Sequence, residues 1–154
     1  MNIRNIFLFI IIFAITNCGF QPIHLSKNTS DFSINEIEEK GDKTINRKIL
    51  SKTNLSKMNE AKVKYNLLIS SLKKNEIISK DASGNPLTYK ISIRVKMILS
   101  NLEDPNIIFK QKIFNSSFNY NEKESKFSLS QYVGIIESNL IDKISKDIRI
   151  FLNN

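Results

Sequence analysis

The segment that most restricts the fold is Leu87–Leu99, along which apolar and polar side chains alternate. Every second side chain is apolar and shares one face, while Thr, Lys, Ser and Arg side chains occupy most of the other. A repeat of two is the repeat of a β-strand, whereas a helix of this sequence would scatter its apolar residues around the axis. A strand with one polar face is typical of an antiparallel sheet with one face in solvent. The segment therefore predicts a sheet that needs a covering layer on one face only.

Three further segments are predicted to be strands. Lys62–Ser70 alternates in the same way, and Phe32–Glu38 is a weaker candidate. Ile107–Tyr120 also alternates, but its pattern slips near Gln111–Lys112, where a β-bulge is one explanation. Short connections favour antiparallel pairing of the last three strands. Turn-forming residues lie between these strands, at Asp81–Pro86 and Asn101–Asn106.

The first predicted helix follows Gly41, which interrupts the first strand. Asp42 can accept hydrogen bonds from the first free backbone N–H groups of a helix, so we expect it to cap a helix that continues to Met58. The expected apolar side of this helix carries Ile45, Ile49 and Leu50.

The second predicted helix is long, Ser128–Leu152, and Ser128 with Gln131 resembles a capping box at its start. Apolar residues recur along it at the three- and four-residue spacing of an amphipathic helix. They are Leu129, Val133, Ile136, Leu140, Ile144, Ile148 and Phe151.

The order strand, helix, three strands, helix predicts an α+β fold. We expect a two-layer sandwich in which two helices pack on one face of a roughly four-stranded sheet. The apolar stripe of the last helix should face Tyr89, Ile91, Ile93 and Val95. We divide the chain into residues 1–17, a signal peptide, residues 18–30, a tether, and residues 31–154, the folded domain.

The N-terminal segment has the features of a bacterial lipoprotein signal. Arg4 precedes the apolar run Ile6–Ile15, which is too short to span a membrane, and Cys18 follows directly. We therefore expect the Cys18 thiol to carry a diacylglycerol and the new N-terminus an acyl chain, with no other cofactor. Asn17 departs from the small residue usual before the cysteine. Gly19 is not the aspartate that retains many lipoproteins in the inner membrane, which favours the outer membrane, facing the periplasm.

Two alternatives to this interpretation stay open. The first is an ordinary signal peptide, or an uncleaved anchor, with an incidental cysteine. The second concerns the net charge of +8, from 23 basic and 15 acidic residues. A basic excess favours anionic partners, but a composition rich in Ile, Lys and Asn also reflects an A/T-rich genome. Export past the inner membrane argues against nucleic acid as the partner.

We find no signal of an enzyme. His24 is the only histidine and lies in the predicted tether. No cluster has the spacing of metal ligands, and no glycine-rich loop leads from a strand into a helix. Glu36, Glu38 and Glu39 are too close in sequence for a convincing acid and base pair. We therefore expect a protein without catalytic residues and without a metal.

Three segments resemble the lipopolysaccharide-assembly lipoprotein family LptE in its alphaproteobacterial form. The first is Cys18–Pro22, which is similar to the Cys-Gly-Phe-x-Pro start of mature members. The second is the turn Ser83–Gly84 followed by Leu87–Ile93, an amphipathic strand with a tyrosine near its start. The third is Phe118–Asn121 followed by a charged loop and the helical segment Ile141–Leu152. With the element order, the resemblance covers nearly the whole mature chain.

The resemblance implies two helices on a four-stranded sheet and a non-catalytic function. Family members act as plug and assembly factor inside the outer-membrane barrel LptD and are implicated in binding lipopolysaccharide. Ala82 stands where the family has a basic residue at the hairpin turn. The alternatives are a barrel-assembly accessory protein, an anchored module that binds an anionic lipid or glycan, and an ordinary solvated sheet face. The candidate lipopolysaccharide-binding residues are the basic side chains of the strands and turns: Lys62, Lys64, Lys80, Lys90, Arg94, Lys96, Lys123 and Lys126.

Overall fold

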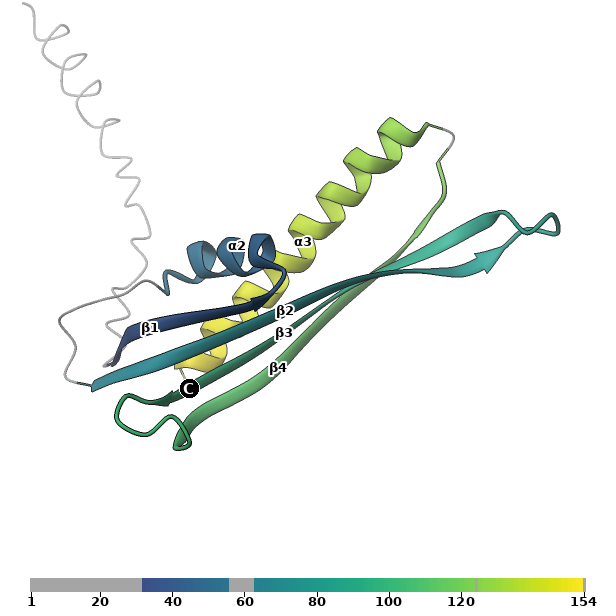
Figure 1. Cartoon of the computed structure of the whole chain (residues 1–154). Coiled ribbons are helices and arrows are strands. Elements are labelled where there is room, and N and C mark those ends of the chain that lie inside the picture. Colours follow the sequence, from purple (N-terminus) through teal and green to yellow (C-terminus); the bar gives the residue numbers. More distant parts are fainter. Residues whose placement is uncertain (1–31, 56–62, 124, 154) are drawn as a thin grey trace, which may run out of the picture.

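The computed structural model describes residues 32–55, 63–123 and 125–153, and it confirms the α+β sandwich (Figure 1). Two helices lie on one face of a four-stranded mixed sheet. The predicted signal peptide and tether, Cys18, His24 and Lys62 lie outside the described residues. The elements are β1 (Phe32–Gly41), α2 (Lys43–Thr53), β2 (Val63–Lys80), β3 (Pro86–Asn101), β4 (Ile108–Asn121) and α3 (Lys126–Asn153).

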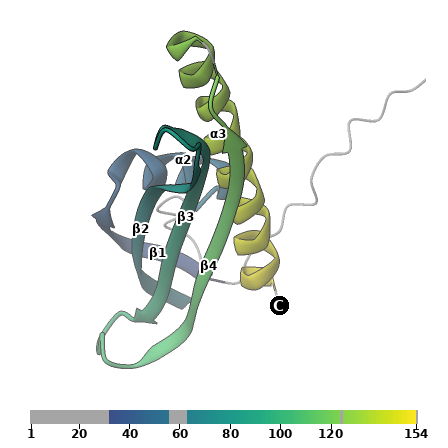
Figure 2. The same ribbon diagram turned by 90° about the vertical axis from the view of Figure 1, so that its right-hand side faces the viewer.

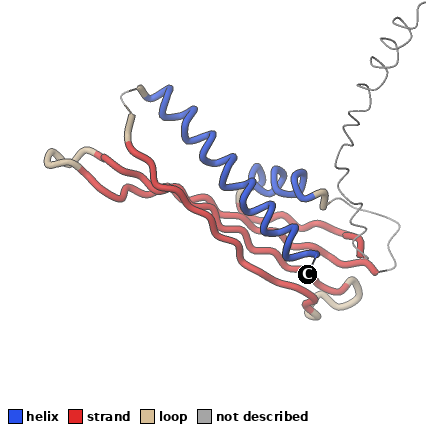
Figure 3. Tube along the Cα trace, turned by 180° about the vertical axis from the view of Figure 1, so that it is seen from behind, coloured by secondary structure: helices blue, strands red, loops and turns tan. Residues whose placement is uncertain are grey.

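The strand order in the sheet is the same as the order in the chain, β1-β2-β3-β4. The pairs β2–β3 and β3–β4 are antiparallel, as their short connections predict. The pair β1–β2 is parallel, and a parallel pair needs a crossover connection. Helix α2 lies in this connection and packs over β1 and β2, whereas α3 runs diagonally over β3 and β4 (Figures 2 and 3).

Helix α2 begins as predicted and ends earlier than predicted. The Asp42 carboxylate accepts hydrogen bonds from the backbone N–H groups of Thr44 and Ile45 at 3.0 and 3.1 Å. The predicted continuation to Met58 is wrong, because the helix ends at Thr53. Asn54 adopts the left-handed conformation there, with φ of 55°, and its N–H bonds to the Ser51 carbonyl.

The core lies between the sheet and the two helices, where the sequence pattern places it. The alternate side chains of β3 from Ile91 to Leu99 are buried on the helix-covered face. The predicted apolar stripe of α3 packs against them, with Ile136, Leu140, Ile144 and Ile148 buried. Ile141, which the stripe did not include, is also fully buried.

Three local predictions need correction. The bulge in β4 is at Phe109, opposite the step from Leu99 to Ser100, and not at Gln111–Lys112, which pair regularly. Helix α3 begins before Ser128, because Ser125 provides the cap. The Ser125 side-chain oxygen accepts a hydrogen bond from the Ser128 backbone N–H at 3.4 Å, so the capping box at Ser128 is not formed.

Strand β2 is much longer than the predicted Lys62–Ser70 and continues to Lys80. Its pairing with β1 stops at Ser71, so beyond this point β2 is an edge strand paired only with β3. We call residues 72–92 the distal hairpin and the part of the sheet that pairs with β1 the proximal half. Figure 1 shows that the distal hairpin extends past α2, while the N-terminal end of α3 diverges from the sheet.

One acidic side chain joins three elements near the point where the two halves meet. Glu137 of α3 accepts hydrogen bonds from the ammonium groups of Lys73 in β2, at 2.9 Å, and Lys48 in α2, at 3.4 Å. The Glu137 side chain exposes only 15% of its surface. Partial burial raises the pKa of this carboxyl, but the two ammonium groups together hold the pKa below its usual value of 4.5.

Candidate anion-binding surface

The outer face of the sheet, opposite the helices, carries a basic strip on β3. Because Ile93, Val95 and Met97 point into the core, the intervening Arg94 and Lys96 point outward, and both are exposed. The Arg94 guanidinium donates a hydrogen bond from Nε to the Asn115 side-chain oxygen on β4, at 3.0 Å. This bond orients the guanidinium and leaves its remaining N–H groups free to donate to an anion.

Two more cations continue the strip toward the tip of the distal hairpin. Lys90 lies four residues before Arg94 and therefore on the same face of β3. Lys74 lies on the adjacent β2, opposite Ser92. Glu76 lies opposite Lys90 and accepts a hydrogen bond from Lys74 at 2.6 Å, which lowers the pKa of the Glu76 carboxyl. The strip therefore holds four cations, Lys74, Lys90, Arg94 and Lys96, beside a single carboxylate.

The structure does not bring the other candidate cations into this strip. Lys64 is opposite Ser33 at the proximal end of β2, and Lys96 is opposite Ser70, so the two lie about 20 Å apart along the strand. Lys80 ends β2 at the hairpin tip, next to the exposed Ala82.

Two candidate cations belong to the helix-covered side of the molecule. Lys123 lies on the connection from β4 to α3, with its ammonium group 4.6 Å from the centre of the Tyr132 ring. Such a contact is a cation–π interaction and already gives Lys123 a partner. Lys126 is the first residue of α3 and is exposed.

Exposed apolar side chains lie among the cations of the strip and along the distal hairpin. Leu72 and Ile113 flank Arg94 and Lys96 on the outer face, and Ile77, Ile78 and Leu87 are exposed along the distal hairpin. A hollow of about 480 Å³ at the β4 edge is lined by Lys96, Gln111, Lys112 and Ile113. Cations beside apolar side chains suit a ligand that carries both anionic groups and hydrocarbon.

The proximal part of the outer face carries both carboxylates and ammonium groups. Glu36 and Glu38 of β1 face outward beside Asn66 and Leu68 of β2, and Glu38 forms an ion pair with Lys40 at 2.8 Å. A hollow of about 370 Å³ is lined by these carboxylates together with Asn66, Leu67, Leu68, Ile98, Ser100, Pro105 and Ile108. The outer face therefore has an excess of cations in the strip and both carboxylates and ammonium groups near β1.

Lys74 was not predicted because the predicted strand ended at Ser70. Apolar and polar residues no longer alternate in residues 72–80, since the side chains of this part of β2 are largely exposed on both faces and neither face needs to be apolar. The available signal was the length of β3. Residues 87–91 need a partner, and the segment before the turn at Asp81 is the one within reach.

The described residues show no arrangement suited to metal binding. Across residues 32–55, 63–123 and 125–153, no group of three or more His, Cys, Asp or Glu side chains could hold an ion.

None of the helices in the described part of the chain combines the length and the apolar character that a membrane span requires.

Comparison with solved structures finds the same fold in bacterial lipoproteins. The rare lipoprotein B of Shewanella oneidensis superposes with a TM-score of 0.54 at 14% identity, covering 74% of this chain and 90% of that one. Lipoprotein B of Nitrosomonas europaea gives 0.52 at 12% identity, with 80% and 85% covered. A minor lipoprotein of Acinetobacter baumannii gives 0.50 at 10% identity, with 77% and 91% covered. No family model matches the sequence, and no curated protein matches it. At these identities the likeness concerns the fold.

Proposed function

We propose that this chain is an outer-membrane lipoprotein of the LptE type, anchored through Cys18 and facing the periplasm. In this proposal it is the plug and assembly factor of the lipopolysaccharide-translocating barrel LptD. It contributes to lipopolysaccharide transport and outer-membrane assembly without catalysing a reaction. The observation that carries the proposal is the basic strip on the outer face, where Lys90, Arg94 and Lys96 lie among exposed apolar side chains on a fold shared with bacterial lipoproteins.

The chemistry of this surface fits lipopolysaccharide. The lipid A part carries phosphate groups, and guanidinium and ammonium groups bind phosphate through charge-assisted hydrogen bonds. Its acyl chains would contact the apolar side chains around the strip, such as Leu72 and Ile113. The strip lies on the face of the sheet that points away from the core and the helices, so its surface is available for a partner without loss of packing.

The lipid-binding part of the proposal is tested by reversing the charge of two residues in the strip. The double variant Arg94→Glu, Lys96→Glu should weaken lipopolysaccharide binding by about tenfold or more at low ionic strength, because two charge-assisted contacts become repulsive. The difference should shrink as salt is added, because salt screens exposed charges. The matched control is the double variant Lys43→Glu, Arg47→Glu on α2. It changes the net charge by the same amount, at exposed positions on the opposite side of the sheet. Equal lipopolysaccharide binding by the two double variants would show that the strip is not the binding surface.

The barrel part of the proposal is tested by pull-down of the full-length chain from detergent-solubilised outer membranes. We expect the LptD barrel to co-purify in stoichiometric amount. Co-purification with other barrels would indicate an assembly accessory protein instead. Recovery of the chain with lipopolysaccharide but without any barrel would indicate an anchored lipid-binding module, and either result would overturn the plug role.

A further inference from the structure

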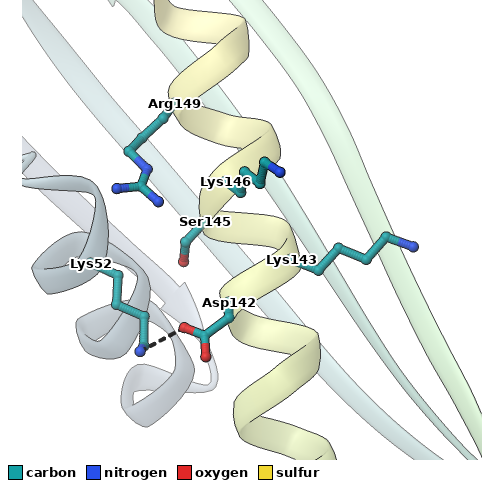
Figure 4. Close-up of a pocket in the computed structure, with 6 residues that line it drawn as sticks. All are labelled: Lys52, Asp142, Lys143, Ser145, Lys146 and Arg149. Atoms are coloured by element: carbon teal, nitrogen blue, oxygen red, sulfur yellow. Dashed lines mark ion pairs between the residues drawn. The ribbon is translucent and has the colours of Figure 1, made fainter.

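A second group of cations lies on the other side of the molecule, in the groove between α2 and α3 (Figure 4). The hollow has a volume of about 560 Å³. Lys52 comes from the last turn of α2. The α3 residues recur at three- and four-residue spacing, which places them along one side of the helix. The lining residues are Lys52, Asp142, Lys143, Ser145, Lys146 and Arg149.

Ser145 has an unmet hydrogen-bonding requirement in this groove. The residue is only 1% exposed, and among the described residues its side-chain oxygen has no hydrogen-bond partner. A buried hydroxyl without a partner costs about 1–3 kcal/mol. Figure 4 shows the Ser145 hydroxyl directed toward α2, into the space that the Lys52 and Arg149 side chains also approach. The hydroxyl can therefore donate to a group bound between the helices.

The charge around Ser145 favours an anion over a water molecule. Of the cationic residues that line the groove, Figure 4 shows Lys52 and Arg149 on the same side of α3 as Ser145, whereas Lys143 extends away from α2. Asp142, the one carboxylate among the lining residues, forms an ion pair with Lys52 at 2.6 Å, so the charge of Arg149 is not balanced by a lining carboxylate. The carbonyl end of α2 near Lys52 is unfavourable for an anion, so a ligand needs the guanidinium and ammonium groups to outweigh it.

We propose that the α2–α3 groove is a binding site for a phosphomonoester, held by Arg149 and Lys52 with a hydrogen bond from the Ser145 hydroxyl. A phosphomonoester carries nearly two negative charges at neutral pH, which suits the cationic excess better than a singly charged diester does. The planar guanidinium of Arg149 can donate two parallel hydrogen bonds to its oxygens. The hollow is larger than a phosphate group alone requires, so the group can belong to a soluble ester or to a lipid headgroup. The site shares no residue with the outer-face strip.

The test measures binding of inorganic phosphate to the purified full chain by calorimetry at low ionic strength in phosphate-free detergent. Arg149→Gln should weaken phosphate binding by about tenfold or more, since it removes a charge-assisted contact. Ser145→Ala should weaken binding by several fold. In phosphate-free buffer, however, Ser145→Ala should unfold at the same urea concentration as the wild type or a higher one, because it removes an unsatisfied buried group. This pair of effects separates ligand binding from a role in folding.

Two controls make the result specific to the groove. Arg47→Gln removes an exposed guanidinium of α2 that does not line the groove, and it should leave phosphate binding unchanged. Displacement of phosphate by glycerol 3-phosphate points to a soluble ester. Displacement only by phosphatidic acid in mixed micelles, and not by phosphatidylcholine, points to a lipid headgroup. Wild-type binding weaker than millimolar, or unchanged binding in both Arg149→Gln and Ser145→Ala, would overturn the proposal.

Discussion

The proximal and distal halves of the sheet are built from the same strands but differ in what covers them. Ile69 of β2 lies under the helices and is fully buried, whereas Ile77, on the same face of the strand in the distal hairpin, is 49% exposed. The proximal half also has a fourth strand, β1, at its edge. The difference indicates that the part of the sheet under the helices supplies most of the core, while the distal hairpin extends past α2 with many exposed side chains.

The difference in coverage is accompanied by a difference in charge. The carboxylates Glu36 and Glu38 lie on the outer face of β1, where Lys40 pairs with Glu38, whereas the basic strip runs from Lys96, opposite Ser70, to Lys90 in the distal hairpin. An anion that approaches the outer face is therefore attracted mainly by the strip, where cations exceed carboxylates.

The largest effect should come from charging the core that the helices form with the proximal half. Ile136 and Ile135 are adjacent in α3, but the first is 4% exposed and the second 60% exposed. Ile136→Asp buries an unpaired carboxylate at a cost of several kcal/mol, comparable to the whole stability of a domain of about 5–15 kcal/mol. We expect Ile136→Asp to lose the folded circular-dichroism signal and Ile135→Asp to keep it. Retention of the signal in both would show that α3 does not form the core.

A smaller difference in stability should separate the two variants at Gly41 and Gly84, the glycines that have positive φ in the described part of the chain. Gly41, φ +74°, joins β1 to α2, and a Cβ there would overlap the Ser71 backbone carbonyl oxygen. Gly84, φ +85°, lies at the hairpin tip with no atom within 4 Å of a Cβ. Gly84→Ala should cost about 1–2 kcal/mol from the left-handed backbone alone, and Gly41→Ala about 3 kcal/mol or more. Urea unfolding measures both, and equal losses would contradict the asymmetry between the halves.

The smallest effect concerns Glu137, at the junction of the two halves. Because its pKa is lowered in the folded protein, its contribution to stability is complete above the ordinary pKa of 4.5 and decreases as the pH falls through the lower, folded value. Stability measured by urea unfolding should therefore decline more steeply below pH 4.5 in the wild type than in Glu137→Gln. Lys74→Gln removes an exposed ammonium bound to Glu76 and serves as the control. Parallel pH profiles for the wild type and Glu137→Gln would show that this ion-pair cluster does not stabilise the junction.

The part of the sheet under the helices was predictable from the sequence because one of its faces must be apolar. The alternation in Leu87–Leu99 and the apolar stripe of α3 both reflect that requirement, and both were confirmed. The same logic fails for residues 72–80, where neither face is buried and no pattern is imposed. The Lys74 contribution to the strip and the convergence of Lys52 with Arg149 depend on register and on helix packing, which bring together residues far apart in sequence. These features required the structure.

The length of β2 sets how far the distal hairpin reaches from the point where the described chain enters the fold. Phe32 pairs with Val63, so the chain enters the fold at the proximal end, while Lys80 lies at the far end of β2 (Figure 1). At about 3.3 Å per residue, the strand from Val63 to Lys80 spans about 55 Å, nearly twice the hydrocarbon thickness of a bilayer, which is about 30 Å. A lipid attached upstream of Phe32 would anchor the proximal end of the sheet. The distal hairpin, with its cationic side chains, would project away from the point of attachment.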